Sequence, residues 1–344
     1  MGRRWSLVIA AILIFSLVSG QVASLSHRPV RAYIPNSNGT VSVIDTNDRL
    51  VVETVSVGQM PRGVAISPDG REVYVANQLS DTVSVIRTAD NKVVATIPVD
   101  EGPYGVAVSP DRKEIYVTQA GPFPAYRTTV SVIDAQAREV VGKIAVGNKP
   151  IGVAVSSDGK RLYVANMAPF EIDNDKSSSL SVVDVKARST LKTVPFDEGM
   201  AAGVALSPDG AFVYVTHQTP QGIVRVLRAS DLETVTKVSV GEGPFGIAVS
   251  PEGAYLYVTN LGNLSAGETV SVIRTQDYTV VDTIKVGRMP VGVAFSPDGK
   301  EVYVACRGRN AVSVIDAATH QVKLIGVGEE PWAFGSFFAQ VPAQ

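Results

Sequence analysis

One phrase of seventeen residues recurs along the chain and constrains the fold more than any other feature of the sequence. Its first complete copy, PRGVAISPDGREVYVAN, occupies residues 61–77, and similar copies begin at Pro103, Pro150, Pro244 and Pro290. The glycine of each copy marks one unit, at intervals of 42 to 51 residues: Gly63, Gly105, Gly152, Gly203, Gly246 and Gly292. Such a period indicates a repeat architecture and not a row of independent domains.

Each unit reads as four short strands separated by turns. In the first complete unit they are GVAIS (63–67), EVYVAN (72–77), TVSVIR (82–87) and KVVATIPV (92–99). These segments are rich in Val, Ile, Thr and Tyr and alternate with period two, which is typical of β-strands. SPDG between the first two strands is a turn sequence. No segment after residue 25 has convincing helical periodicity. Four strands in a period of this length are typical of a β-propeller blade.

The first strand of each unit predicts how neighbouring blades pack. In GVAIS, Gly63, Ala65 and Ser67 point to one face, while Val64 and Ile66 point to the other. A small face on one blade can then meet a branched face on the next, which suits the crowded region around a propeller axis.

The two ends of the chain complete each other. A seventh copy, PWAFGSFF, ends after its first strand (332–338), and the strands it lacks are present near the N-terminus at 31–36, 40–45 and 50–57. The sequence therefore predicts an all-β fold over residues 30–340, a seven-bladed β-propeller of four-stranded antiparallel blades. Three N-terminal strands and one C-terminal inner strand form the last blade, which removes open sheet edges.

The first 24 residues have the composition of a secretory signal. Arg3 and Arg4 precede the apolar run WSLVIAAILIFSLV (5–18), and small residues follow it. We expect cleavage near residues 20–24 and a protein that is periplasmic, on the cell surface or secreted. The apolar run is shorter than the roughly 20 residues of a spanning helix, so no stable membrane span is expected.

Charge and motif content argue against several classes of function for this sequence. The formal net charge is −2 and no basic run is present, so we expect no nucleic-acid binding. A single cysteine, Cys306, cannot form an internal disulfide. The three histidines and the absence of C-x-x-C-H predict neither a multi-histidine metal site nor covalent haem, and no G-x-S-x-G or phosphate loop is found. We expect no metal, no cofactor and no catalytic constellation.

The phrases VYVAN, LYVAN and LYVTN (73–77, 162–166 and 256–260), together with the SPDG turns, resemble the YVTN-type β-propeller repeat family of exported or surface proteins of bacteria and archaea. The resemblance covers about residues 30–340 and implies the propeller fold. It implies little about function, because propellers include binding scaffolds, lactonases and redox enzymes. The family also resembles propellers of periplasmic quinone- and haem-linked electron transfer.

Candidate binding residues gather on one face of the predicted ring. We define the top face as the one with the connections into the inner strands and the loops between second and third strands; the SPDG turns lie on the bottom face. Three top loops are enlarged, at 120–128, 167–179 and 261–268. The residues before the marker glycines form a largely apolar ring at the channel mouth: Arg62, Tyr104, Ile151, Ala202, Phe245, Val291 and Trp332. Phe123, Tyr126 and Phe170 can lean over it. This ring is either a ligand funnel or a packed plug, and the enlarged loops are either binding loops or neutral insertions.

The end of the second strand carries Asn in four of the seven blades, and we expect this Asn to cap the following turn. His217 and Cys306 interrupt the series. His217 is either a buried, hydrogen-bonded residue or a ligand or catalytic base, and Cys306 is expected to be a small core residue. Arg288, Arg307 and Arg309 lie near Glu329 and Glu330 on the top face, as a salt-bridged rim or as a site for an anion.

These features favour an exported, monomeric β-propeller that binds an unidentified protein or small ligand on its top face, through Arg62, Tyr104, Phe123, Tyr126, Phe170, His217, Phe245, Arg288, Arg307 and Trp332. Two alternatives remain open. One is a lactonase- or hydrolase-like enzyme that uses His217. The other is an accessory protein of a periplasmic quinone- or haem-linked electron-transfer system.

Overall fold

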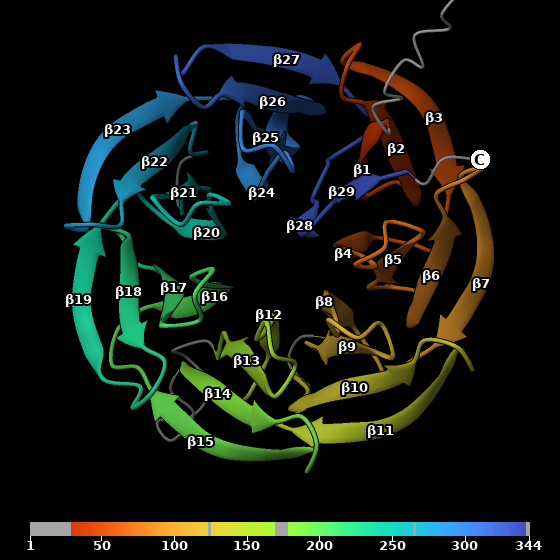
Figure 1. The fold of residues 1–344 in the computed structure, drawn as a ribbon, viewed down its shortest axis with the longest axis horizontal. Coiled ribbons are helices and arrows are strands. Elements are labelled where there is room, and N and C mark those ends of the chain that lie inside the picture. The colour runs from red at the N-terminus through yellow and green to blue at the C-terminus, as the bar shows by residue number, and fades with distance from the viewer. Residues whose placement is uncertain (1–28, 123–124, 169–177, 264–265, 342–344) are drawn as a thin grey trace, which may run out of the picture.

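The computed structural model describes residues 29–122, 125–168, 178–263 and 266–341. Seven sheets surround a central axis, as Figure 1 shows. Within each blade, consecutive strands pair antiparallel, and the one helical element among the described residues is the three-residue 3-10 turn Arg307–Arg309. The predicted all-β, seven-bladed propeller of four-stranded antiparallel blades is confirmed.

Each blade begins with an inner strand at the axis, and its other strands follow outward. Blade 1 contains β4 (Pro61–Ile66), β5 (Glu72–Asn77), β6 (Thr82–Arg87) and β7 (Lys92–Pro98). Blade 2 contains β8 (Pro103–Val108), β9 (Glu114–Gln119), β10 (Thr129–Asp134) and β11 (Glu139–Ala145). Blade 3 contains β12 (Pro150–Val155), β13 (Arg161–Asn166), β14 (Ser179–Asp184) and β15 (Ser189–Pro195). Blade 4 contains β16 (Met200–Leu206), β17 (Phe212–Gln218), β18 (Ile223–Arg228) and β19 (Thr234–Ser239).

Blade 5 contains β20 (Pro244–Val249), β21 (Tyr255–Asn260), β22 (Thr269–Arg274) and β23 (Thr279–Lys285). Blade 6 contains β24 (Pro290–Phe295), β25 (Glu301–Cys306), β26 (Ala311–Asp316) and β27 (Val322–Gly326). Blade 7 contains β29 (Phe338–Gln340), β1 (Val30–Asn36), β2 (Thr40–Asp45) and β3 (Leu50–Ser56). The remaining strand, β28 (Phe334–Gly335), pairs in parallel with β4 of blade 1.

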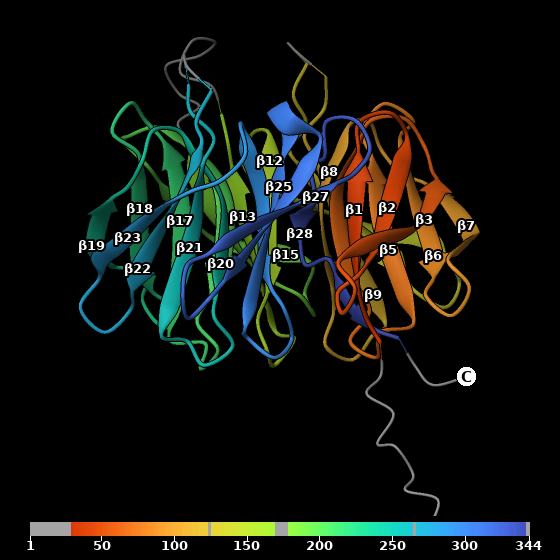
Figure 2. The ribbon, with the colours of Figure 1, turned by 90° about the horizontal axis from the view of Figure 1, so that it is seen from above.

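Blade 7 joins the two ends of the chain as the sequence predicts. β29 pairs antiparallel with β1, and the Tyr33 amide donates to the Phe337 carbonyl at 2.9 Å. The Val341 amide donates to the Pro29 carbonyl at 2.9 Å, so the first and last described residues lie side by side. Figure 2 shows the ring edge-on, with this junction on the face opposite the Arg307–Arg309 turn.

The inner strand of blade 7 differs from the expected continuous strand at 332–338. In blade 1, Pro61 and Ile66 pair with Asn77 and Val73. In blade 7, Pro331 and Phe338 pair with Asn36 and Ala32. Between these paired positions, blade 7 has eight residues (331–338) opposite five of its second strand, whereas blade 1 has six residues (61–66) opposite five. The two additional residues let the chain leave β1, form β28 against β4, and return as β29.

The marker glycines let neighbouring inner strands approach each other closely. A Cβ atom on Gly203 would lie 2.4 Å from the Phe245 carbonyl oxygen of the next blade. Gly63, Gly105, Gly152 and Gly246 meet the equivalent carbonyl at 2.0–2.3 Å, and Gly292 meets the Ala333 carbonyl at 1.9 Å. Any side chain there would force the blades apart, because packed interiors leave no free space for an extra methyl group. The repeated glycine is thus a requirement of the ring.

The hydrophobic core is divided into layers between adjacent blades. Ala65 of blade 1 packs in one cluster with Val106 of blade 2, while Val64 belongs to the cluster shared with blades 6 and 7. This confirms the expected packing of a small face against a branched face.

The Asn at the end of the second strand joins it to the third strand. The Asn77 amide donates to Ser84 Oγ at 2.9 Å and to Thr82 Oγ1 at 3.1 Å, and Asn166 and Asn260 make the same pair of bonds. The expected cap on the turn is therefore a side-chain bond across the strand pair. We call this arrangement the Asn–Ser clasp.

A second contact ties each blade to the one before it. The turn between third and fourth strands carries a residue with left-handed backbone in every blade: Arg49, Asn91, Arg138, Arg188, Leu232, Tyr278 and His320. In blade 2, Arg138 Nη2 donates to Glu72 Oε1 of blade 1 at 3.0 Å, and the Tyr74 hydroxyl donates to Glu72 Oε2 at 2.6 Å. We call this contact, between the third-to-fourth-strand turn of one blade and the second strand of the blade before it, the turn latch. The Tyr and the Asn of the YVAN phrase thus act at opposite ends of one strand.

Candidate functional site

The ring of residues at the top mouth of the axis is closely packed. All seven of its members are buried: Arg62, Tyr104, Ile151, Ala202, Phe245, Val291 and Trp332. Phe334 of β28 joins them, with its ring centroid 5.1 Å from Phe245 and 5.9 Å from Tyr104. Trp332 meets the same two rings edge-on at 6.0 and 6.3 Å. This aromatic plug fills the mouth, so the packed-plug interpretation describes the top of the axis better than an open funnel.

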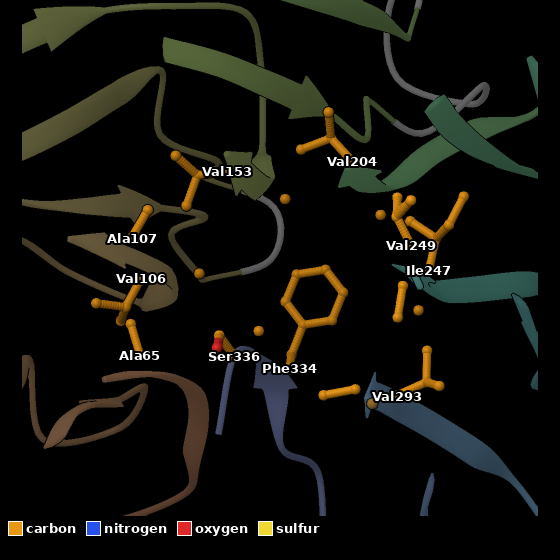
Figure 3. A pocket seen from close by; sticks show the side chains of 18 of the residues that line it. Ala65, Val106, Ala107, Val153, Val204, Ile247, Val249, Val293, Phe334 and Ser336 are labelled. Carbon is orange, nitrogen blue, oxygen red and sulfur yellow. The ribbon is translucent and has the colours of Figure 1, made fainter. Parts of the chain in front are cut away.

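Below the plug lies a cavity of about 470 Å³ on the axis. The inner strands of blades 1 to 6 line it together with Phe334, Gly335 and Ser336, and Phe334 projects into it, as Figure 3 shows. The lining extends to Pro251 and Pro297 in the bottom turns, so the cavity reaches the bottom face. Its side chains are those of Ala, Val, Ile, Phe and Pro, together with Ser296 and Ser336.

Among the described residues, those that line the cavity include no titratable side chain, and only one of the two hydroxyl groups is free. Ser296 Oγ donates to Asp298 Oδ1 at 2.7 Å, which commits this hydroxyl to its own turn. Ser336 is exposed at the cavity and makes no side-chain hydrogen bond with the described part of the chain. The site can bind an apolar surface and offer one hydrogen bond, but its side chains cannot carry out acid–base chemistry.

Two guanidinium groups contact the outer side of the plug. The Arg62 guanidinium carbon lies 3.8 Å from the centre of the Trp332 ring, and that of Arg307 lies 5.3 Å from it. Arg307 also pairs with Glu330 at 2.9 Å. Burial lowers the pKa of Arg62, and the charge of Arg307 acts in the same direction. Arg288 and Arg309 are exposed on the same face.

The enlarged loops contribute fewer site residues than the sequence predicts. Phe123 and Phe170 lie outside the described residues. Tyr126 is half-buried, and Lys149 Nζ lies 4.7 Å from the centre of its ring, which is a cation–π contact. The structure therefore joins Arg62, Tyr104, Phe245, Arg307 and Trp332 in one cluster at the mouth, and it places Tyr126 beside Lys149.

His217 is fully buried inside blade 4. Its Nδ1–H donates to the Glu198 carbonyl at 3.1 Å, and Phe196 packs edge-on with ring centroids 4.4 Å apart. Burial lowers its pKa to about 4, and the charge of Arg225 adds to the effect. The imidazole is therefore neutral at physiological pH, and its buried Nε2 has no hydrogen-bond partner within the described ranges.

Arg225 explains why blade 4 departs from the Asn–Ser clasp. It occupies the position of the clasp serine and is itself buried. Arg225 Nη2 bonds to Glu198 Oε1 at 2.6 Å and to Asp197 Oδ1 at 3.0 Å. His217 and Arg225 have changed together, and blade 4 holds a local ionic cluster where its neighbours hold an amide. The sequence signal for this exchange is in the third strand, where IVRVLR (223–228) has Arg225 in place of the serine of TVSVID.

Cys306 replaces the clasp Asn in blade 6 and is buried. Its Sγ lies 3.3 Å from Ser313 Oγ, and burial raises the pKa of the thiol. Over the described ranges, no three or more His, Cys, Asp and Glu residues gather as a metal centre would require. The same ranges contain no helix with the length and apolarity to cross a membrane.

The sequence profile of the YNCE-like β-propeller family matches residues 8–338. The chain belongs to this family. Among solved structures, this YNCE-like propeller is similar to a chain of hydrazine synthase from Kuenenia stuttgartiensis, with a TM-score of 0.74, 24% identity, and coverage of 88% of this chain and 99% of that one. It is also similar to dihydro-heme d1 dehydrogenase NirN, solved in complex with DHE, with a TM-score of 0.65, 15% identity, and coverage of 91% and 75%. No curated protein sequence matches it. At these identities the two structures show a shared fold.

Sequence reasoning missed the axial cavity and the strand that closes its upper end. Aligning PWAFGSFF with PRGVAISP places Phe334 where blade 1 has Val64. An aromatic residue at an inner-strand position was therefore a visible signal that the last copy fills the axis. The additional length of that copy was not visible, because no second strand follows it to define the pairing.

Proposed function

We propose that this YNCE-like propeller is a binding protein without catalytic activity, and that it holds a small apolar molecule in the axial cavity. The observation that carries the proposal is the cavity of about 470 Å³, whose lining is aliphatic and aromatic apart from two serines. Ligand sites in proteins commonly have volumes of roughly 300–1,000 Å³ and a mainly apolar lining with few polar groups. Apolar burial would supply the affinity, at about 25 cal/mol per Å².

The bottom mouth gives the ligand an orientation. The upper end is closed by Phe334, while Ser336 lies at the cavity with a free hydroxyl. A second depression of about 650 Å³ adjoins it on the bottom face and shares Ile66, Pro297 and Ser336. This depression also includes Asp69 and Arg71. The arrangement suits a molecule with an apolar body inside the axis and a polar end toward the bottom face.

Export is part of the proposal. The predicted signal at residues 1–24 and the YVTN-type resemblance both favour a periplasmic, surface-bound or secreted protein. The binding role keeps the main prediction from the sequence but moves the ligand from the top face to the axis, because the plug occupies the top mouth. The predicted monomeric state and a protein partner on the top face remain predictions.

Mass spectrometry and a fluorescent apolar probe test this function. Organic extracts of the natively purified full chain should contain an apolar compound, and 1-anilinonaphthalene-8-sulfonate should bind with saturation. Ser336→Trp should weaken probe binding at least tenfold by blocking the mouth, without lowering the melting temperature. Ser239→Trp, at an exposed position of β19, is the matched control and should bind normally. An empty extract with no saturable probe binding, or equal binding by both variants, would contradict the proposal.

A second candidate is an accessory role in electron transfer. It is favoured by the similarity to chains of hydrazine synthase and of a dihydro-heme d1 dehydrogenase. Among the described residues, the cavity lining has no His, Met or Cys side chain to ligate haem iron, so this role would use the propeller as a scaffold for a redox partner. Visible absorption of the natively purified protein and its co-purifying partners distinguishes the two. A chromophoric partner would favour the accessory role, and a colourless protein with a bound apolar compound would favour the binding role.

The hydrolase alternative can be tested through His217. If the chain hydrolyses lactones or esters with this residue as base, His217→Ala must abolish the rate. The buried, neutral imidazole described above gives a substrate no direct contact, so we expect no turnover that depends on it. A rate that disappears in His217→Ala while the fold is kept would replace the binding proposal with an enzymatic one.

A further inference from the structure

The top mouth holds a buried positive charge without a carboxylate partner. Arg62 is 6% exposed, and its Nε donates to the side-chain oxygen of Gln78 at 3.0 Å. Its Nη1 reaches Ser37 Oγ only at 3.5 Å. No ion pair of Arg62 occurs within the described part of the chain. A buried cation is costly unless an opposite charge accompanies it, so this group lacks the partner that its burial calls for.

An unpartnered hydrogen-bond donor lies against this cation. Trp332 is 8% exposed, and its Nε1–H is buried near the Tyr104 hydroxyl but has no hydrogen-bond partner of acceptable geometry among the described residues. The Arg62 guanidinium stacks on the same indole ring. Buried indole N–H groups normally find an acceptor. A cation without an ion-pair partner and an indole N–H without an acceptor therefore lie together at the mouth.

Arg307 adds a second cation at the mouth, and its present partner is Glu330. Its guanidinium carbon lies 5.3 Å from the centre of the Trp332 ring, and its pair with Glu330 is partly open to solvent, with side-chain exposures of 31% and 47%. Both guanidinium groups lie over the Trp332 ring, which places them around a common point. Glu330 pairs with Arg307 and also attracts Arg62, so these three groups together carry one uncompensated positive charge.

We propose that the top mouth binds a monoanionic carboxylate, with Arg62 and the Trp332 Nε1–H as its primary donors and Arg307 as a secondary one. A planar carboxylate matches the guanidinium geometry and neutralises one charge. A phosphate group, with about −1.5 to −2 charges, would exceed that balance. The carboxylate belongs either to a small molecule or to an acidic side chain of a protein partner. This site lies at the opposite end of the axis from the apolar cavity and does not depend on the function proposed there.

Tryptophan fluorescence tests the proposal directly. The chain has two tryptophans, Trp5 and Trp332, so the full chain with Trp5→Phe reports on Trp332 alone. Titration with sodium acetate, against sodium chloride at equal ionic strength, should give a saturable change in emission. Arg62→Met should weaken the response at least tenfold, while Arg288→Met, at an exposed position on the same face, should leave it unchanged.

Two further arms give the source of the carboxylate and separate binding from folding. An aspartate-containing peptide that binds more than tenfold tighter than acetate assigns the group to a protein partner, and equal or weaker binding assigns it to a small molecule. In chloride buffer, Arg62→Met should raise the melting temperature, because it removes an unbalanced buried charge while its apolar stem remains. The absence of a response to both ligands in the parent chain would overturn the proposal. An unchanged response in Arg62→Met would do the same.

Discussion

Arg188 Nη2 of blade 3 lies 2.8 Å from Glu114 Oε1 of blade 2. The other oxygen of this carboxylate accepts a hydrogen bond from the Tyr116 hydroxyl at 2.8 Å, and Arg188 Nη1 also donates to the Val141 carbonyl at 2.8 Å. The tyrosine that is repeated in the sequence therefore holds the acceptor that joins one blade to the next.

Arg188→Ala should lower the free energy of unfolding by about 1 kcal/mol, because it removes a half-exposed ion pair and a bond to a backbone carbonyl between two blades. Arg274→Ala is the control, since Arg274 pairs with Asp277 inside a single exposed turn. It should change stability by less than about 0.5 kcal/mol. Urea denaturation measures both. Equal losses would mean that the turn latch contributes nothing specific to blade docking.

Asn260→Ala should destabilise the fold by about 1–3 kcal/mol, because it leaves the half-buried Thr269 and buried Ser271 hydroxyls without their donor and opens space beside Gly241. Asn263→Ala, three residues later and exposed, should be nearly neutral. Thermal unfolding of the two variants at one pH is a sufficient comparison. A neutral Asn260→Ala would show that the Asn–Ser clasp is not a source of stability.

Gly203→Ala should destabilise by about 3 kcal/mol, because its Cβ would lie 2.4 Å from the Phe245 carbonyl oxygen and the inner strands have no room to separate. Gly326→Ala is a matched control: no atom lies within 4 Å of the added Cβ. The control should be neutral or slightly stabilising. Chemical denaturation with both variants decides the matter, and comparable effects would refute the role of the marker glycines in blade packing.

His217 should make stability depend on pH between about 6.5 and 4. Its pKa falls from 6.5 in the unfolded chain to about 4 in the folded one. As the pH drops below 6.5, the unfolded chain gains a proton that the folded chain does not, so the free energy of unfolding falls by up to roughly 3 kcal/mol and levels off below the folded pKa. The difference in unfolding free energy between the parent and His217→Asn, measured at several pH values, isolates this contribution. A difference independent of pH would contradict it.

The sequence was sufficient for the fold because each repeat carries its own geometric requirement. Gly63 and its equivalents, the alternation around Val64, and the split seventh copy each predicted a contact that the structure contains. The functional surface was harder to predict, because it depends on departures from the repeat. Arg62 and Trp332 were correctly placed at the mouth, but their burial, the missing ion-pair partner of Arg62 and the missing acceptor of Trp332 depend on how seven different residues meet across the axis. The bottom opening was missed because its lining consists of ordinary strand residues.

The departure of the chain from β1 to β4 at Phe334 links closure of the ring to closure of the axis, two properties that are separate in a symmetric ring. The segment that seals the circle between β1 and β4 is also the segment that blocks passage along the centre. Detachment of the C-terminal end would therefore unseal the circle and unblock the centre in one event. A ligand can then enter the axial cavity from the top face only when the ring itself opens. In the intact molecule, ligands enter and leave through the bottom face.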